Sequence, residues 1–368
     1  MRESKKIVFF GLLPGKNPRL YGGGELGNQR TVNMFKEFGY NVSIIRKTGL
    51  KNDKTRLVRY TTYPFRFIYD TVRIFIFLLF STRKKLVHYS GFAGASIFVE
   101  NIQTSIIKML GYKLVYELRG GGGLYYFKNS TEKYRKLFSK VVNRADFIFA
   151  QGEENIPIIN QLTKTKCCHY PNIVEDNFMP SVCPPKEADT VNLIFFGRIQ
   201  IDKHVLLIVE VASILQKKMK NVTLTVIGNG PAEYREKVME MMENRLAAGT
   251  YRMIPGCTHD ELKGYLSSMH FFIFPSTQPL EGQSNSLTEA MSYGIIPIVS
   301  PQGFNKSTVG DDMFVVNELS AEKYAESILD LIDNNDITDL SKRTYNRIRN
   351  HYTKRQVYDR IKDLYDSL

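Results

Sequence analysis

Short apolar runs alternate with amphipathic helical segments along most of the chain. Residues 6–12 have the pattern of a buried strand, and after a loop that contains glycines a helix is predicted from about 25 to 38. Further apolar runs, typical of the middle of a parallel sheet, lie at 41–45, 86–89, 113–117 and 147–150. This alternation predicts a mostly parallel sheet with helices packed on it.

A second alternating series follows a segment without periodicity. Residues 171–190 contain four prolines and are predicted to be a linker. Beyond it, strands are expected at 191–196, 223–227, 271–274 and 296–299, a helix at 205–217 and a turn at 228–231. A length of 368 residues also suits two domains. We therefore expect an α/β fold with domains at 1–175 and 185–350, and a helix at about 350–368 that packs back onto the first domain. Ligands of such sheets bind at the carboxyl ends of strands, so the expected site is the cleft between the domains.

Neither a membrane-spanning helix nor a disulfide framework is expected. The apolar run 7–13 is short for a signal sequence, has no small-residue cleavage site after it, and fits a first strand. The longest apolar stretch, 74–80, is far shorter than the ~20 residues that span a bilayer. Four cysteines, two of them adjacent, and six histidines have no metal-ligand spacing. These features favour a cytoplasmic protein.

Positive charge is concentrated in the N-terminal half. The formal charge is +13, and residues 1–170 contain 29 Lys and Arg against 11 Asp and Glu, whereas the rest of the chain contains 21 against 26. Such asymmetry is typical of a domain that binds nucleic acid or an anionic membrane. No nucleic-acid-binding module matches, so no nucleic acid partner is expected. We hypothesise that the N-terminal domain docks peripherally on the inner face of the plasma membrane.

Two segments bear on that hypothesis. Residues 63–85 mix aromatic and aliphatic side chains with basic ones. This pattern is found in interfacial helices, but it favours a core helix followed by the basic turn Arg83-Lys84-Lys85. Residues 133–144 have an apolar stripe opposite basic side chains, which favours a core helix.

Two carboxylates and two cations are the main candidates for chemistry. Glu281 is expected on a loop and Glu289, eight residues later, in the first turn of a helix; Ser286 and Glu289 have the spacing of a capping box. Backbone amides at this helix start would suit an anion such as a diphosphate. Alternatively, Glu289 only caps the helix and Glu281 is a solvated loop residue.

The cations lie directly after a predicted strand. Arg198 follows Gly197, and Lys203 comes five residues later. Together they can neutralise a diphosphate without a metal, although a solvated pair beside a helix start has the same pattern. Since no Asp-x-Asp occurs in the chain, we expect neither a metal nor another cofactor. Two glycine runs, residues 22–24 and the four glycines after Arg119, allow close backbone approach to a ligand or form flexible loops.

In combination these motifs resemble the family 4 (group 1) glycosyltransferases. The resemblance rests on Glu281-x7-Glu289 with the following Ala-Met and Gly294-x-x-Pro297, on Gly197-Arg198 with Asp202-Lys203, and on Gly228-Asn-Gly-Pro231. It covers mainly residues 190–310. It implies the GT-B fold, in which two Rossmann-like domains face a central cleft, and transfer with retention of anomeric configuration.

The resemblance also assigns roles by position. Glu289 would hold the donor ribose, Glu281 and the backbone of 282–287 the donor sugar and phosphates, and the glycines at 22–24 would close over the diphosphate. Catalytic roles fall to Glu281, Arg198 and Lys203, and donor contacts to Gly23, Gly24, Arg119, Gly197, Asn229, Gly256, Gly282, Asn285, Ser286, Leu287 and Glu289. Arg119 stands where the family often has a histidine, and Asn285 is expected to add a side-chain amide to a loop that is usually Gly-Phe-Gly or Gly-Phe-Pro.

The expected function is transfer of a sugar from a nucleoside diphosphate sugar to a saccharide or lipid-linked acceptor, in cell-surface polysaccharide synthesis. A front-face attack, in which the leaving phosphate takes the acceptor proton, needs no protein nucleophile. A nucleotide-sugar epimerase of GT-B shape and a non-catalytic nucleotide-sugar-binding protein remain as alternatives.

Overall fold

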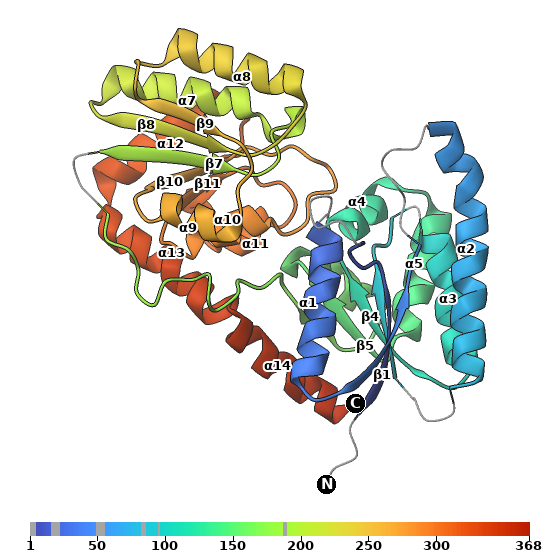
Figure 1. Ribbon diagram of the computed structural model, residues 1–368. Helices are drawn as coiled ribbons and strands as arrows, with labels where there is room; N and C mark the ends of the chain where they lie inside the picture. Colours follow the sequence, from blue (N-terminus) through green and yellow to red (C-terminus); the bar gives the residue numbers. More distant parts are fainter. Residues whose placement is uncertain (1–4, 16–22, 49–55, 82–85, 95, 187–189) are drawn as a thin grey trace. The chain divides into compact units, whose positions relative to one another are not determined.

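The chain forms two compact units. The computed structural model describes residues 5–15, 23–48, 56–81, 86–94, 96–186 and 190–368 (Figure 1). The units divide between Pro171 and Asn172. The last helix belongs to the second unit in this division, and its predicted packing onto the first stays a prediction.

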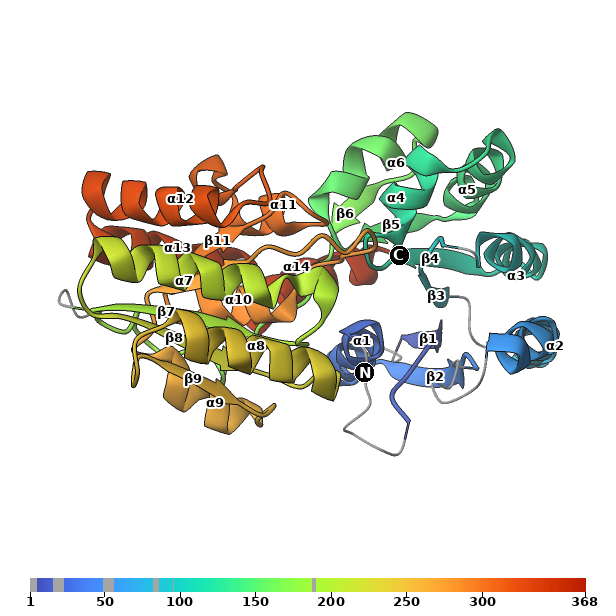
Figure 2. The same cartoon turned by 90° about the horizontal axis from the view of Figure 1, so that it is seen from above.

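The N-terminal unit is a parallel six-stranded sheet in the order β2-β1-β3-β4-β5-β6. Its strands are β1 (Lys6–Gly11), β2 (Asn41–Arg46), β3 (Leu86–Gly91), β4 (Lys113–Leu118), β5 (Phe147–Ala150) and β6 (Cys167–His169). Its helices are α1 (Gly23–Glu37), α2 (Arg56–Leu79), α3 (Ile97–Met109), α4 (Gly122–Asn129), α5 (Glu132–Arg144) and α6 (Ile156–Leu162). α2, α3 and α5 pack side by side on one face of the sheet, and α1 lies on the other (Figures 1 and 2).

Apolar patterning explains both layers of this unit. The four residues from Ile7 to Phe10 are completely buried, because a central parallel strand is covered on both faces. In α5 the predicted core stripe is confirmed: Tyr134, Phe138 and Val141 are buried. The Thr131 hydroxyl begins α5 by accepting a hydrogen bond from the Tyr134 amide.

The C-terminal unit has a parallel five-stranded sheet in the order β11-β10-β7-β8-β9. Its strands are β7 (Val191–Phe196), β8 (Val222–Ile227), β9 (Tyr251–Ile254), β10 (Phe271–Phe274) and β11 (Ile296–Val299). The helices are η3 (Ile201–Lys203), α7 (Val205–Lys218), α8 (Ala232–Arg245), α9 (His259–Leu266), α10 (Asn285–Met291), α11 (Asn305–Val309), η4 (Asp312–Phe314), α12 (Ala321–Asn334), α13 (Ile337–His351) and α14 (Lys354–Ser367). The α/β fold class with two parallel sheets is thus confirmed.

Strand order in this sheet reverses between β7 and β10. The chain builds outward from β7 through β8 to β9 and then returns to add β10 and β11 on the other side of β7. The loops that follow β7 and β10 therefore diverge at the carboxyl edge, which is where open α/β sheets bind their ligands. The predicted cations follow β7 and the predicted carboxylates follow β10.

The loops after β7, β8 and β9 are tied to one another in series. The Ile199 amide donates to the Asn229 carbonyl at 2.9 Å, and the Gly228 amide donates to the Ile254 carbonyl at 2.9 Å. A Cβ atom on Gly230 would lie 1.9 Å from the Ile199 carbonyl oxygen. Glycine at 230 is therefore required by close backbone approach, and it holds this edge of the sheet compact.

Described residues of the proline-containing segment that is predicted to be a linker are hydrogen-bonded to the C-terminal unit. The Val174 amide donates to the Tyr352 carbonyl, and the hydroxyls of Tyr293 and Tyr345 donate to carbonyls of Phe178 and Pro180. Its lack of periodicity reflects irregular backbone held by side-chain hydroxyls.

No helix among the described residues has both the length and the apolar character needed to cross a bilayer.

Gly230→Ala should destabilise the C-terminal unit, because the new Cβ meets a backbone oxygen that cannot rotate away. We expect a loss of about 1–3 kcal/mol in the free energy of unfolding, as at other overpacked positions, measured by urea unfolding of the full chain. Gly264→Ala is the matched control: a Cβ there meets nothing within 4 Å in α9, and alanine should be neutral or stabilise by about 0.5–1 kcal/mol. Equal stability of the two variants would contradict the close loop approach.

Candidate functional site

The two loops at the strand-order reversal are joined by hydrogen bonds. The Thr277 amide, after β10, donates to the Asp202 carbonyl at 2.9 Å. The His204 Nε2 and Thr277 Oγ1 atoms lie 2.7 Å apart. The segments 198–204 and 275–286 are therefore joined at this edge of the sheet.

A buried ion pair also joins these two segments. The Lys203 Nζ contacts the Glu281 Oε2, and the two residues are 5% and 9% exposed. Ser276 completes the cluster, since its hydroxyl lies 2.8 Å from the same carboxylate oxygen and 3.2 Å from Nζ. The ammonium also stands over the Phe274 ring, 4.8 Å from its centre. The alternative in which Glu281 is a solvated loop residue is excluded by this burial.

Arg198 and Glu289 lie near Lys203 and Glu281 in the sequence, but their surroundings differ from those of the ion pair. Arg198 is exposed, as is Gly197 beside it. The Glu289 carboxylate lies 3.3 Å from the His259 Nε2 atom of α9. The structure therefore brings Lys203 and Glu281 into contact, whereas Arg198 and Glu289 are held by neither of them in any described contact.

The expected capping box at 286–289 is wrong. α10 begins two residues earlier, with Ser284 as its N-cap: the Ser284 hydroxyl accepts from the Leu287 amide, and its backbone is extended. Ser286 is instead inside the first turn, with its hydroxyl 2.9 Å from that of Ser284. Since residue 287 is leucine, no side chain returns to the cap, and Glu289 lies beyond the first turn.

Two glycines, Gly303 and Gly197, lie close to residues of the site loop. A Cβ on Gly303, in the loop after β11, would lie 2.5 Å from the Glu281 carbonyl oxygen, and Gly303 has a φ of +63°. A Cβ on Gly197 would lie 3.9 Å from the Ser286 hydroxyl, so the end of β7 approaches the start of α10. Among the other predicted residues, Gly282 and Asn285 are partly exposed and Leu287 is buried in the core.

Asn229 and Gly256 lie together at the ends of β8 and β9. The Gly256 amide donates to the Asn229 side-chain oxygen at 3.1 Å, and a Cβ on Gly256 would meet the Asn229 side-chain nitrogen at 2.5 Å. Both residues are exposed. They form a second polar area on the same carboxyl edge as the Lys203–Glu281 pair.

The other predicted contacts belong to the N-terminal unit. Gly22 lies outside the described residues, whereas Gly23 and Gly24 begin α1. A Cβ on Gly24 would lie 3.0 Å from the Phe92 ring. The basic turn at 83–85 also lies outside the described residues.

Arg119 is part of a buried network. Its guanidinium lies 2.6 Å from the Glu117 carboxylate and donates to the Thr31 hydroxyl at 2.8 Å, and the residue is 3% exposed. The other Glu117 oxygen lies 2.7 Å from the His88 Nε2. Burial by itself raises the pKa of Glu117, but the charge of Arg119 and the hydrogen bond with His88 lower it below its usual value. The structure thus gives Arg119 a structural role, and its contact with a donor sugar stays a prediction.

Gln283 is a residue of the site loop that sequence reasoning did not single out. Its side-chain oxygen accepts from the Asn172 amide at 2.6 Å, and its side-chain nitrogen donates to the Asn172 carbonyl at 3.1 Å. Asn172 in turn donates from its side chain to the Gln283 carbonyl at 3.2 Å. The partners are 111 residues apart, so no local signal in the sequence reveals the bond.

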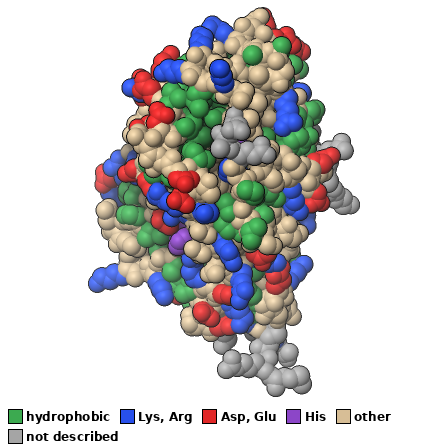
Figure 3. Space-filling model, turned by 90° about the vertical axis from the view of Figure 1, so that its left-hand side faces the viewer, with side chains coloured by type: hydrophobic (Ala, Val, Ile, Leu, Met, Phe, Trp, Pro, Cys, Tyr) green, Lys and Arg blue, Asp and Glu red, His purple; other side chains and the backbone are tan. Residues whose placement is uncertain are grey.

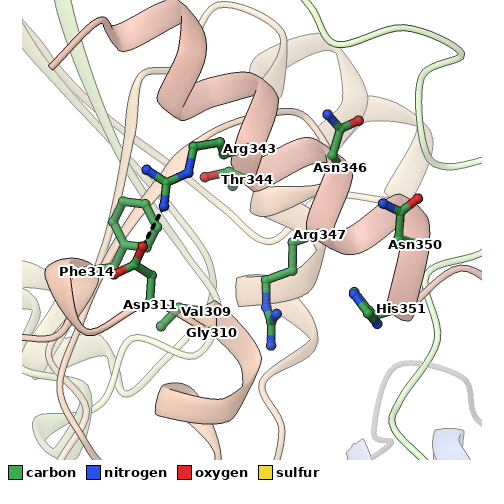
Figure 4. Close-up of a pocket in the computed structure, with 10 residues that line it drawn as sticks. All are labelled: Val309, Gly310, Asp311, Phe314, Arg343, Thr344, Asn346, Arg347, Asn350 and His351. Carbon is green, nitrogen blue, oxygen red and sulfur yellow. Dashed lines mark hydrogen bonds and ion pairs between the residues drawn. The ribbon is translucent and has the colours of Figure 1, made fainter.

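A cavity of about 330 Å³ lies elsewhere, between α13 and the loop after α11 (Figure 4). Its arginines are engaged by the protein: Arg343 lies 2.6 Å from Asp311, and Arg347 donates to the Thr308 carbonyl at 2.7 Å. None of the predicted site residues lines it. Within the described ranges, no group of three His, Cys, Asp or Glu side chains is placed to hold a metal ion.

Comparisons with known proteins agree with the motifs in the C-terminal unit. Residues 184–351 match the family described as "Glycosyl transferases group 1". No curated protein matches the sequence.

Solved structures with a similar fold cover nearly the whole chain. HepE from Anabaena, crystallised with UDP, is 13% identical with a TM-score of 0.69, over 99% of this chain and 100% of that one. Sucrose-phosphate synthase from Thermosynechococcus elongatus is 14% identical with a TM-score of 0.73, over 99% and 98%. The lipopolysaccharide outer core galactosyltransferase WaaB is 13% identical with a TM-score of 0.69, over 99% and 100%. At these identities the likeness shows the fold, which is GT-B.

Arg119→Met should lower stability by about 3–5 kcal/mol at neutral pH, because it leaves the Glu117 carboxylate buried without its main cation. A carboxylate with a lowered pKa stabilises the fold above its unfolded-state pKa, and this contribution is lost as the pH falls through the folded-state pKa. The stability difference from wild type should therefore shrink on acidification below about pH 4.

Arg198→Met is the control for this prediction, because Arg198 is exposed and its loss should change stability by no more than about 0.5 kcal/mol. Both variants are compared by urea unfolding at several pH values. An Arg119→Met protein as stable as Arg198→Met would show that the buried network is not structural.

Proposed function

Because residues 184–351 match the group 1 glycosyl transferases, and because the two sheets have the GT-B fold, we propose that the protein transfers a sugar from a nucleoside diphosphate sugar to a hydroxyl group of a saccharide or lipid-linked acceptor. The observation that carries the proposal is the buried Lys203–Glu281 pair at the strand-order reversal, with the exposed Arg198 in the same segment after β7 as Lys203. It supplies charge of both signs where an open α/β sheet binds a ligand.

In the proposed reaction the cations stabilise the leaving group. Lys203 has three N–H donors, and its contacts with Glu281 and Ser276 occupy two of them. Arg198 offers a planar guanidinium at the same edge, on a surface open to solvent. As the glycosidic bond breaks, negative charge develops on the diphosphate, and preorganised cations stabilise this transition state more than the ground state.

The surroundings of Glu281 support a front-face mechanism with retention of configuration. A carboxylate oxygen that already binds an ammonium and a hydroxyl is a weak nucleophile, so we assign Glu281 to binding and orienting donor hydroxyls. The acceptor oxygen then attacks from the side of the leaving diphosphate, which takes the acceptor proton. The glycosidic bond to the phosphate breaks, and a new bond forms on the same face of the sugar.

Glu289 is proposed to bind the ribose of the donor. Its partner His259 is mostly exposed, so a ligand hydroxyl can replace the imidazole without leaving a buried group unpaired. Asn229 and Gly256, at the ends of β8 and β9, are proposed to contact the nucleoside.

UDP is the nucleotide to test first, and cell-surface polysaccharide synthesis is the proposed setting. Similar structures were determined with UDP-glucose for HepE, and WaaB is a galactosyltransferase of the lipopolysaccharide outer core. These facts concern the neighbours, and they support the proposal by likeness of fold only.

Glu289→Gln should weaken donor binding while the fold is kept. In a thermal-shift screen of UDP-, GDP- and ADP-sugars against the wild type, we expect stabilisation by UDP-sugars, equal to about 2.7 kcal/mol at a ligand concentration 100 times the Kd. The variant should lose most of that shift at the same ligand concentration. Stabilisation by none of the three donors would contradict the proposed function.

Lys203→Met and Glu281→Gln should each abolish most transfer and also destabilise the protein by about 3–5 kcal/mol, since each leaves a buried partner uncompensated. The double variant should regain much of the stability but none of the activity. Arg198→Met should lower kcat/KM by about 100-fold without loss of stability.

Transfer is measured with labelled donor, and the anomeric configuration of the product is read by NMR. An inverted product would refute retention. Donor interconversion without transfer would indicate an epimerase, and binding without either reaction would indicate a sensor. Recovery of activity in the double variant would remove the pair from the mechanism.

A further inference from the structure

The outward face of α2 is apolar from Phe65 onward. From residue 65 to residue 80, every exposed residue is hydrophobic, and the exposed positions recur at intervals of three and four, as one stripe on a helix. We call these residues the α2 stripe; the most exposed are Phe80 (77%), Phe65 (73%) and Ile68 (62%). The inward face, by contrast, carries Asp70, which accepts hydrogen bonds from Thr48.

The neighbouring helix α3 continues this surface. α2 and α3 pack against each other (Figures 1 and 2), and the exposed residues of α3 are Phe98, Ile102 and Met109. They lie on one side of that helix. An ordinary surface helix turns charged and polar residues to water, so two adjacent helices with apolar outward faces mark an interaction surface.

A basic helix borders the apolar surface. α5 packs against α3, and its exposed side chains include Lys133, Arg135, Lys136 and Lys140. The Lys133 ammonium lies 5.8 Å from the centre of the Phe98 ring, so the apolar and basic areas are in contact. The face of the molecule shown in Figure 3 differs, because acidic and basic side chains are interspersed on it.

The net charge of the N-terminal unit distinguishes between two possible partners of this surface, a second copy of the chain and an anionic membrane. Residues 1–170 have a net charge of +18, from 29 basic and 11 acidic residues. A second copy of the chain would bring two such units, with two basic borders, against each other. An anionic bilayer accepts apolar side chains at the level of its headgroups and attracts lysine and arginine beside them.

We propose that the α2 stripe and the exposed residues of α3 insert into the interfacial region of an anionic membrane, with the basic face of α5 on the lipid headgroups. The helices lie along the surface, in keeping with the absence among the described residues of a helix that could span a bilayer. Of the two interpretations of residues 63–85, this structure favours the interfacial helix, since the apolar side is exposed. The inference goes beyond the proposed transfer reaction and does not depend on it.

Co-flotation of the full chain with vesicles tests the proposal. The wild type should float with vesicles of phosphatidylcholine and phosphatidylglycerol, and at least tenfold less with phosphatidylcholine alone. A triple variant of the α2 stripe (Phe65→Ser, Ile76→Ser, Phe80→Ser) should lose at least tenfold in affinity for the anionic vesicles. Charge reversal on α5 (Lys136→Glu, Lys140→Glu) should also weaken binding, and salt should weaken the binding of the wild type.

Matched controls separate this surface from general hydrophobicity and from catalysis. Val182→Ser with Leu319→Ser removes exposed apolar residues of the C-terminal unit and should leave flotation unchanged. The stripe variant should keep the thermal shift with a UDP-sugar, so a failed membrane proposal and a failed transfer proposal are distinguishable. Binding of the stripe variant equal to wild type, or no binding by the wild type, overturns the proposal. Conversion of a wild-type dimer to a monomer by the stripe variant, seen by light scattering, would assign the surface to a second copy instead.

Discussion

The buried contact between Lys203 and Glu281 is the interaction on which the site depends. Removing an ammonium and a carboxylate from water is costly, and a buried pair stabilises a fold only when its geometry and additional hydrogen bonds compensate. Here the Ser276 hydroxyl contacts both groups and the Phe274 ring lies beneath the ammonium. The pair connects the segments that follow β7 and β10. The pair therefore mainly fixes the position of the two loops relative to each other, although the chain leaves β7 and β10 in different directions.

Much of this architecture can be predicted from the sequence, because buried parallel strands leave a local signal. Runs such as those of β7 and β10 are largely apolar, and the predicted strands agree with the structure to within a residue. β6 and β9 are not predicted as strands, because Cys-Cys-His has no apolar run and β9 contains Arg252; their positions depend on pairing with β5 and β8. The side chains of the site follow from the same logic: once the strand order reverses between β7 and β10, residues after both strands must meet.

The errors and omissions concern features that local patterns do not determine. Ser284 and Ser286 both lie near the start of α10, and the Ser-x-x-Glu spacing favours Ser286 as the N-cap, whereas the extended backbone needed there occurs at Ser284. In α2 the amphipathic pattern is compatible with a core helix, which the sequence favours, and with an interfacial helix. Only the tertiary structure shows that Asp70 faces inward and the apolar stripe outward. Arg119 is predicted to contact the donor, but in the structure its guanidinium binds Glu117 and Thr31.

The amide pairing of Gln283 with Asn172 has a consequence for communication along the chain. Asn172 is the first residue of the C-terminal unit, and a single side chain next to Glu281 binds both polar groups of its backbone. The first residue of the C-terminal unit is therefore held by the loop that carries Glu281. A ligand that reorders this loop would change the support of Asn172, and by thermodynamic reciprocity a change at Asn172 would alter the affinity of the loop for that ligand.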